Sequence, residues 1–131
     1  MSEISVLHID DSVEYLEFTR SMLTCANPGY SVESAQTVDL ARQKLLQFKD
    51  RKKKYDVILM DYDLGCSTNG LELVRRFIDG EADALIIMLS AFEDEIIKKA
   101  AQSLGVSCFL TKKEIMSDCF MLHKVISERI S

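Results

Sequence analysis

The sequence is poor in residues that break or cross-link a chain: its 131 residues include one proline, five glycines, four cysteines and no tryptophan. No stretch is rich in proline, glycine or serine and no segment repeats, so we find no linker and predict one domain over residues 1–131. The cysteines match no zinc-binding or redox spacing. We interpret Cys25, Cys66, Cys108 and Cys119 as reduced thiols, mostly core filler, in a cytoplasmic protein.

Positive charge is also in short supply, because 16 Lys and Arg face 21 Asp and Glu, for a net charge of −5 at pH 7. Nucleic-acid phosphates are bound by clustered Lys and Arg, so we expect no direct contact with nucleic acid. The basic run Arg51-Lys52-Lys53-Lys54 lies between two apolar segments and is interpreted as a solvated loop rather than a docking patch. No apolar run approaches the roughly 18 residues that a membrane helix needs, so we expect no membrane contact.

Five short apolar runs rich in β-branched residues predict five strands. They are residues 4–9, 30–34, 57–60, 84–89 and 106–110. The third and fourth runs are almost continuous in Val, Ile, Leu and Met instead of alternating with polar residues. Such continuity is typical of strands that are covered on both faces of a parallel sheet.

Helical spacing follows each predicted strand. The first helix ends at the Asn27-Pro28-Gly29 turn, Thr37 and Asn69 can cap the second and third, and Gly105 closes the fourth. The third runs from residue 70 to about residue 79. The fifth is lined by Ile115, Cys119, Leu122 and Ile126. Five strands alternating with five helices predict a doubly wound α/β domain, in which helices flank both faces of a five-stranded parallel sheet.

Polar side chains follow four of these strands. They are Asp10 and Asp11 after the first, Asp61 and Asp63 after the third, Ser90 after the fourth, and Lys112 after the fifth. Ligands of such sheets bind beyond the carboxyl ends of the strands, so we expect these side chains to meet at one edge. A lone Asp after a strand is commonly a turn residue or a helix cap. Polar residues at four strand ends together indicate function.

The chemistry of these residues points to phosphoryl transfer. The carboxylates of Asp10, Asp11 and Asp61 repel one another unless a cation lies between them, and Mg²⁺ is the hard ion that prefers oxygen ligands. A carboxylate nucleophile, a divalent ion, a hydroxyl and a lysine are what transfer of a phosphoryl group to an aspartate requires. Because Asp61 ends a central strand, we predict that it is the nucleophile.

In the segments "VLHIDDS", "DVILMDYDLG", "IIMLSA" and "GVSCFLTKK" the sequence resembles the receiver domain of two-component response regulators, over essentially the whole chain. The resemblance implies a flavodoxin-like fold similar to that of chemotaxis regulators. It also implies that Asp61 takes a phosphoryl group from a sensor histidine kinase, a phosphotransfer protein or a small phosphodonor. The partner that reads the signal would be an output domain or a target protein, and no output domain follows within these residues.

The resemblance also implies a role for each site residue. Asp10 and Asp11 match the acidic pair that holds Mg²⁺, and the main-chain carbonyl of Asp63 would supply another ligand. Lys112 matches the lysine that contacts the phosphoryl group. Ser90 and Phe109 match the pair that moves on phosphorylation and changes the surface of the fourth helix, fifth strand and fifth helix. His8 and Tyr15 are interpreted as packed residues without a role.

Two departures and two alternatives accompany this interpretation. Lys113 stands where receivers usually have a proline after a cis bond, and the loop after Asp61 lacks the common Met-Pro. A phosphohydrolase of the haloacid dehalogenase type uses similar residues, but its nucleophile strand comes first, whereas Asp10 and Asp11 open this chain. A degenerate receiver that docks a partner without phosphorylation is the second alternative. We expect no enzymatic activity beyond self-catalysed phosphotransfer to Asp61 and its dephosphorylation.

Overall fold

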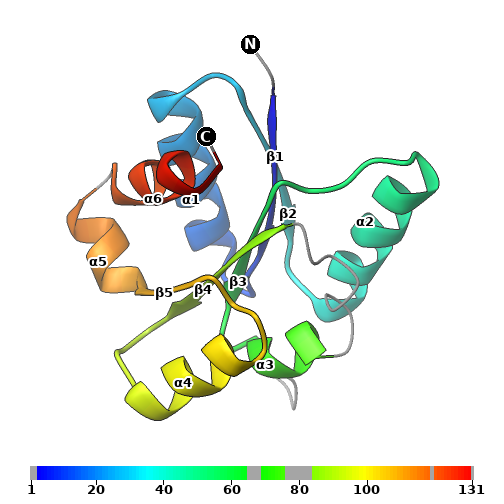
Figure 1. Ribbon diagram of the computed structural model, residues 1–131. Coiled ribbons are helices and arrows are strands. Elements are labelled where there is room, and N and C mark those ends of the chain that lie inside the picture. Colours follow the sequence, from blue (N-terminus) through cyan, green and yellow to red (C-terminus); the bar gives the residue numbers. More distant parts are fainter. Residues whose placement is uncertain (1–2, 65–68, 76–83, 119, 131) are drawn as a thin grey trace.

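The computed structural model describes residues 3–64, 69–75, 84–118 and 120–130 (Figure 1). Its strands are β1 (Ile4–Ile9), β2 (Tyr30–Ala35), β3 (Val57–Asp61), β4 (Leu85–Ser90) and β5 (Cys108–Thr111). They form one parallel sheet in the order β2-β1-β3-β4-β5. The predicted five-stranded parallel sheet is confirmed, so the carboxyl ends of all five strands lie along one edge.

Helices cover both faces of this sheet. The described helices are α1 (Val13–Ala26), α2 (Val38–Asp50), α3 (Gly70–Leu73), α4 (Glu95–Ser103), α5 (Lys112–Ser117) and α6 (Met121–Ile130). In Figure 1, α1, α5 and α6 lie on one side of the sheet, and α2, α3 and α4 lie on the other. The predicted doubly wound architecture is therefore confirmed.

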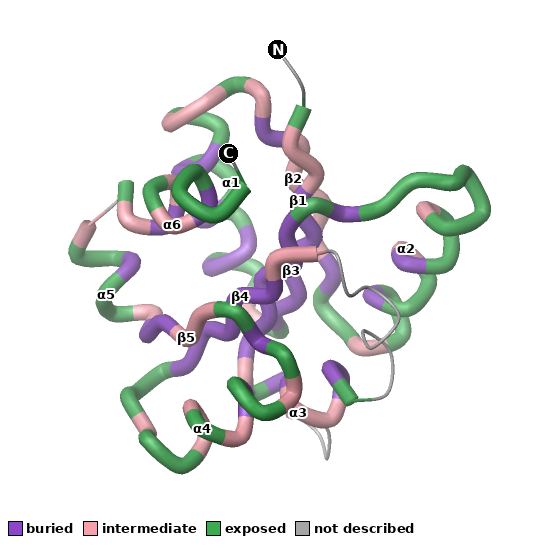
Figure 2. The backbone as a smooth tube through the Cα atoms, viewed as in Figure 1, coloured by how far each residue is buried: buried purple, intermediate pink, exposed green. Residues whose placement is uncertain are grey.

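The central strand β3 shows why its sequence is continuously apolar. All five of its residues are buried, and Figure 2 shows buried backbone through the middle of the sheet. Val57 and Leu59 belong to the core on the α1, α5 and α6 side, whereas Ile58 and Met60 belong to the core on the other side. Burying such a side chain completely stabilises the fold by about 1.5–3 kcal/mol. The strand is thus fixed rigidly beneath Asp61, its last residue.

Short polar side chains start the helices where the sequence predicts them. The side-chain oxygens of Thr37 and Asn69 accept the N–H groups of Leu40 and Glu72, at 3.1 and 3.0 Å. Each such cap is worth about 1 kcal/mol. Just beyond the carboxyl end of α4, Gly105 has a φ of 96°, a left-handed conformation that glycine adopts without strain. Both predicted caps and the predicted end of the fourth helix are confirmed.

The predicted single fifth helix is wrong, because the structure divides it into α5 and α6. Between them Asp118 has an extended backbone, with φ −134° and ψ 100°, and its side chain accepts the N–H of Phe120 at 3.0 Å. An Asp side chain that bonds nearby main-chain groups competes with the helix. The buried positions Ile115, Leu122 and Ile126 are nevertheless those predicted. The domain therefore has six helices among its described residues instead of five.

The structure also bears on the predictions made for the cysteines, the third helix and the basic run. Cys25 is exposed, so its interpretation as core filler is wrong, and Cys108 is half-buried, while Cys66 and Cys119 lie outside the described residues. The third helix begins at Gly70 as predicted, and residues 76–79 of its predicted range also lie outside the described residues. The four residues of the basic run are all exposed.

Within the described part of the chain, no helix combines the length and the apolar character needed to cross a bilayer.

Candidate functional site

The site lies where the chain changes direction across the sheet. From β1 the chain crosses first to β2 on one side, and β3 then pairs with β1 on the other side. In parallel sheets such a switch point is where ligands bind. Ile9 pairs with Met60, so the next residues, Asp10 and Asp61, come out of the sheet beside each other.

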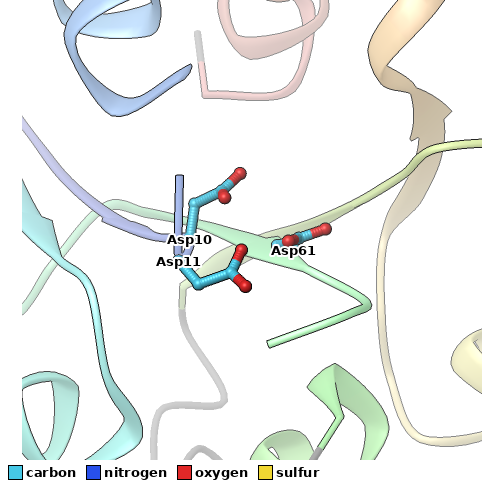
Figure 3. Close-up of side chains that lie close together, drawn as sticks. All are labelled: Asp10, Asp11 and Asp61. Carbon is cyan, nitrogen blue, oxygen red and sulfur yellow. The ribbon is translucent and has the colours of Figure 1, made fainter. Parts of the chain in front are cut away.

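Three carboxylates meet at this point (Figure 3). One carboxylate oxygen from each of Asp10, Asp11 and Asp61 lies within 4.8 Å of the others. Asp10 is fully buried and Asp61 is only 4% exposed, whereas Asp11 is exposed. The predicted acidic cluster is therefore present in the structure, and it is reached from solvent on the side of Asp11.

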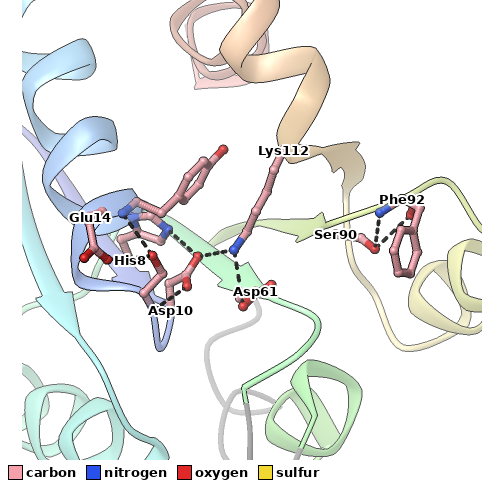
Figure 4. Close-up of polar contacts among 9 residues, drawn as sticks. His8, Asp10, Glu14, Asp61, Ser90, Phe92 and Lys112 are labelled. Carbon is pink, nitrogen blue, oxygen red and sulfur yellow. Dashed lines mark hydrogen bonds and ion pairs between the residues drawn. The ribbon is translucent and has the colours of Figure 1, made fainter.

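Lys112, which directly follows β5 as the first residue of α5, joins this cluster. Its Nζ atom lies 2.8 Å from Oδ2 of Asp10 and 3.4 Å from Oδ2 of Asp61 (Figure 4). Burial acts to lower the pKa of Lys112, but the hydrogen bond to Asp10 and the charges of both carboxylates outweigh burial and raise the pKa. The lysine is therefore a cation. Its backbone is fixed by a capping box, in which Thr111 and Glu114 each bond the other's main-chain N–H.

The surroundings of Asp61 disfavour the charged form of its carboxyl group. Burial, and next the charge of Asp10, raise its pKa from 3.8 to about 7, although Lys112 and the main-chain N–H of Asp63 act in the opposite direction. Three carboxylates and one ammonium group leave an excess of two negative charges when all are ionised. A divalent cation balances that excess, and an all-oxygen donor set suits Mg²⁺. The residues therefore fit a magnesium ion.

The loop after Asp61 is fixed at both of its ends. Asp63 has an exposed side chain, and its backbone forms an antiparallel bridge with that of Asn69. Gly70 donates its N–H to the carbonyl of Tyr62 at 2.7 Å. A Cβ atom on Gly70 would lie 2.7 Å from the main-chain oxygen of Asp61. The chain thus folds back closely over Asp61 because residue 70 has no side chain.

We expect Gly70→Ala to destabilise the fold by about 1–3 kcal/mol, because the new methyl group forces the backbone away from Asp61. Urea unfolding measures the change. Gln102→Ala, on the exposed side of α4, is the control and should shift the free energy of unfolding by less than about 0.5 kcal/mol. Equal stability of Gly70→Ala and wild type would contradict this account of the loop.

Ser90 and Phe109 lie near the cluster without joining it. The buried hydroxyl of Ser90 donates to the carbonyl of Phe92 at 2.9 Å and accepts the N–H of the same residue at 3.4 Å. Figure 4 shows these contacts on the side of Asp61 away from Asp10. Phe109 is half-buried and packs against the core on the α2, α3 and α4 side. The structure thus brings Asp10, Asp11, Asp61 and Lys112 together, whereas the Ser90 hydroxyl bonds its own turn.

Two residues beside the site have no role in the sequence-based interpretation. The Tyr15 ring centroid lies 4.6 Å from Nζ of Lys112, and Nε2 of His8 lies 3.8 Å from Oδ2 of Asp10. Burial, and then the charge of Lys112, lower the pKa of His8 to about 3. The imidazole is therefore neutral, and its contact with Asp10 is not an ion pair. His8 lies in β1, and Asp10 follows two residues later, just beyond the end of that strand. Because alternate residues of an extended chain lie on the same face, this spacing is the signal that predicts the proximity.

Comparison with known proteins agrees with this geometry. The chain matches the response regulator receiver domain over residues 6–121. It is 30% identical over 112 residues to the transcriptional regulatory protein ComA of Bacillus subtilis (strain 168), a match that covers 83% of this chain and 49% of ComA. The chain therefore spans about half the length of this curated relative.

Solved structures show the same fold. The chemotaxis protein CheY4 of Vibrio cholerae superimposes with a TM-score of 0.78 at 23% identity, covering 97% of this chain and 98% of that one. The phosphorylated cyanobacterial phytochrome response regulator RcpA gives a TM-score of 0.80 at 20% identity, covering 97% and 93%. By its sequence match along most of its length, the chain belongs to the response regulator receiver domain family.

Proposed function

We propose that this domain is a phosphoacceptor in which Asp61 takes a phosphoryl group from the phosphohistidine of a sensor histidine kinase or phosphotransfer protein. The observation that carries the proposal is that the Asp61 carboxyl, at the end of the central strand, shares Lys112 with Asp10 and meets two other carboxylates within 4.8 Å. A nucleophile, its cation and a metal-binding cluster are therefore assembled before any donor arrives.

The transfer itself needs little beyond positioning. A carboxylate oxygen of Asp61 bonds to phosphorus, the phosphorus–nitrogen bond of the donor breaks, and the electron pair of that bond stays on the imidazole. The ammonium group of Lys112 offsets negative charge on the phosphoryl oxygens. A magnesium ion held by Asp10, Asp11, Asp61 and the main-chain carbonyl of Asp63 would supply further positive charge there.

Structural relatives support this proposal by what they contain. The RcpA structure is that of a phosphorylated protein, and a response regulator of Burkholderia pseudomallei was solved with a phosphorylated aspartic acid and a calcium ion. The DrrB receiver domain was solved in a form activated by BeF3. Each shares the fold of this chain, so this arrangement of strands accommodates an aspartyl phosphate and a divalent cation.

The conformational response of the domain to phosphorylation is part of the same proposal. Ser90 must give up its bond to the Phe92 carbonyl to reach a phosphoryl oxygen, and Phe109 would then move with it. The surface affected is formed by α4, β5 and the predicted fifth helix, which the structure divides into α5 and α6. On this surface Ile96 of α4 is 82% exposed. An output domain or a target protein would read that surface. We place the domain in the cytoplasm, where thiols such as that of Cys25 stay reduced.

Beryllofluoride binding tests the proposal against a degenerate receiver. With Mg²⁺ present, wild type should give a bound fluorine NMR signal that a chelator abolishes and that Asp61→Asn lacks. A bound signal of equal intensity in Asp61→Asn, or none in folded wild type, would contradict a phosphoacceptor role for Asp61.

Phosphate-monoester turnover tests the phosphohydrolase alternative. Because the domain is proposed to react only with its own aspartate, wild type should release no more p-nitrophenol from p-nitrophenyl phosphate than Asp61→Asn does. Steady release that depends on Asp61 would show an enzyme instead.

A further inference from the structure

We propose that Tyr15 is a positioning residue, whose aromatic ring holds the ammonium group of Lys112 at the acidic site. The inference rests on the proposed function, because Lys112 is the cation assigned to the phosphoryl group. It adds a residue to that site on geometric grounds.

The ring and the ammonium group are in direct contact. Tyr15 lies in the first turn of α1 and is only 8% exposed, and its ring centroid is 4.6 Å from Nζ of Lys112. A cation within about 6 Å of a ring centroid is attracted by the negative face of the ring. The same Nζ atom lies 2.8 Å from Asp10, so one ammonium group contacts both the ring and a buried carboxylate.

Neighbouring aromatic residues fix the ring. His8, which is fully buried, meets it edge to face, with centroids 5.9 Å apart and planes at 74°. Phe18 packs against it with centroids 5.8 Å apart. The Tyr15 N–H is bonded to Oγ of Ser12, the cap of α1. A ring held from its backbone and from two neighbours is a rigid support for a flexible lysine.

The hydroxyl group of Tyr15 contributes nothing to this support. Its oxygen is buried without a hydrogen-bond partner among the described residues. Burial, and next the charges of Asp10 and Asp61, raise the pKa of Tyr15, so the side chain stays neutral. The face of the ring therefore provides the contact, and phenylalanine should replace tyrosine without loss.

The contact matters because the other partners of Lys112 are proposed metal ligands. Oxygens of Asp10 and Asp61 that bind a cation are less available to the ammonium group, whereas the ring does not compete for metal. Tyr15 therefore keeps Lys112 at the site when those carboxylates are engaged.

Proton NMR tests the contact directly. Protons above an aromatic face are shifted upfield, so the Lys112 side-chain methylenes nearest Nζ should resonate upfield of those of exposed lysines. Tyr15→Phe should keep this shift and Tyr15→Leu should lose it, with amide spectra confirming that both variants fold. Ordinary Lys112 shifts in wild type would overturn the proposal whatever the variants do.

Phosphorylation kinetics tests the consequence. With saturating Mg²⁺ and acetyl phosphate, Tyr15→Leu should lower the rate constant for Asp61 phosphorylation about tenfold, and Tyr15→Phe should stay within about twofold of wild type. Equal rates for the leucine and phenylalanine variants would overturn the positioning role. If wild type accepts no phosphoryl group, the proposed function fails, and the NMR comparison still decides whether Tyr15 holds Lys112.

Discussion

Asp61→Asn should be more stable than wild type by about 2–4 kcal/mol in the free energy of unfolding at pH 8 without divalent cations. The reason is that the pKa of Asp61 is raised from 3.8 to about 7 in the folded protein, chiefly by burial and then by the charge of Asp10. Ionising this group opposes folding. Asparagine has nearly the same shape and no charge.

The raised pKa of Asp61 also decides how the free energy of unfolding changes with pH. Between about pH 4 and pH 7 the folded state binds more protons at Asp61 than the unfolded state does, so its contribution to stability falls as the pH rises. The advantage of Asp61→Asn should be small near pH 4 and complete above pH 7. His8, with its pKa lowered to about 3, contributes the opposite slope between about pH 3 and pH 6.5, but this cancels when the two proteins are compared.

Urea unfolding of both proteins between pH 4 and pH 8 measures this difference. Asp50→Asn, which removes an exposed carboxylate at the end of α2, is the control and should stay within about 0.5 kcal/mol of wild type throughout. If Asp61→Asn were more stable than wild type by the same amount at every pH, or less stable above pH 7, the surroundings of Asp61 would not raise its pKa. Added Mg²⁺ should stabilise wild type more than Asp61→Asn, because it binds the carboxylate.

Lys112→Ala should change stability in the opposite direction, by a loss of about 2–4 kcal/mol at pH 7 without divalent cations. Asp10 is fully buried, and Lys112 is its cation at 2.8 Å. Removing one partner of a buried pair leaves the other charge without compensation. Saturating Mg²⁺ should restore part of the loss, since it supplies positive charge at the same carboxylates.

An exposed ion pair provides the matched control for this variant. Lys124 is 64% exposed and lies 3.5 Å from Asp118, so Lys124→Ala should lose less than about 1 kcal/mol. Urea unfolding with and without Mg²⁺ compares the two variants. If both lose equally little, Lys112 does not compensate a buried charge and the electrostatic description of the site is wrong.

Much of this architecture is encoded locally and could be predicted. The continuous apolar run of β3 requires cover on both faces, and short polar residues such as Thr37 and Asn69 start helices by bonding exposed N–H groups. Once the sheet is parallel, its strand ends must share an edge. The meeting of Asp10, Asp11, Asp61 and Lys112 follows from that geometry.

Other features depend on hydrogen bonds and long-range contacts that the apolar and polar pattern of the sequence does not specify. The break between α5 and α6 follows from Asp118 bonding the N–H of Phe120, although the apolar spacing continues across it. The Ser90 hydroxyl can rotate, and its bond to the Phe92 carbonyl is set by the turn. The contact of Tyr15 with Lys112 joins α1 to the first residue of α5, and no local pattern specifies that distance.

Above all, we propose that Asp61 accepts a phosphoryl group in an acidic site that requires Mg²⁺. Intact-protein mass spectrometry after incubation with acetyl phosphate measures this directly, with wild type and Asp61→Asn compared in Mg²⁺ and in chelator. We expect one added phosphoryl group in wild type with Mg²⁺, and none in chelator or in Asp61→Asn. The same adduct in Asp61→Asn, or an unmodified wild type with acetyl phosphate and with phosphohistidine donors, would contradict it.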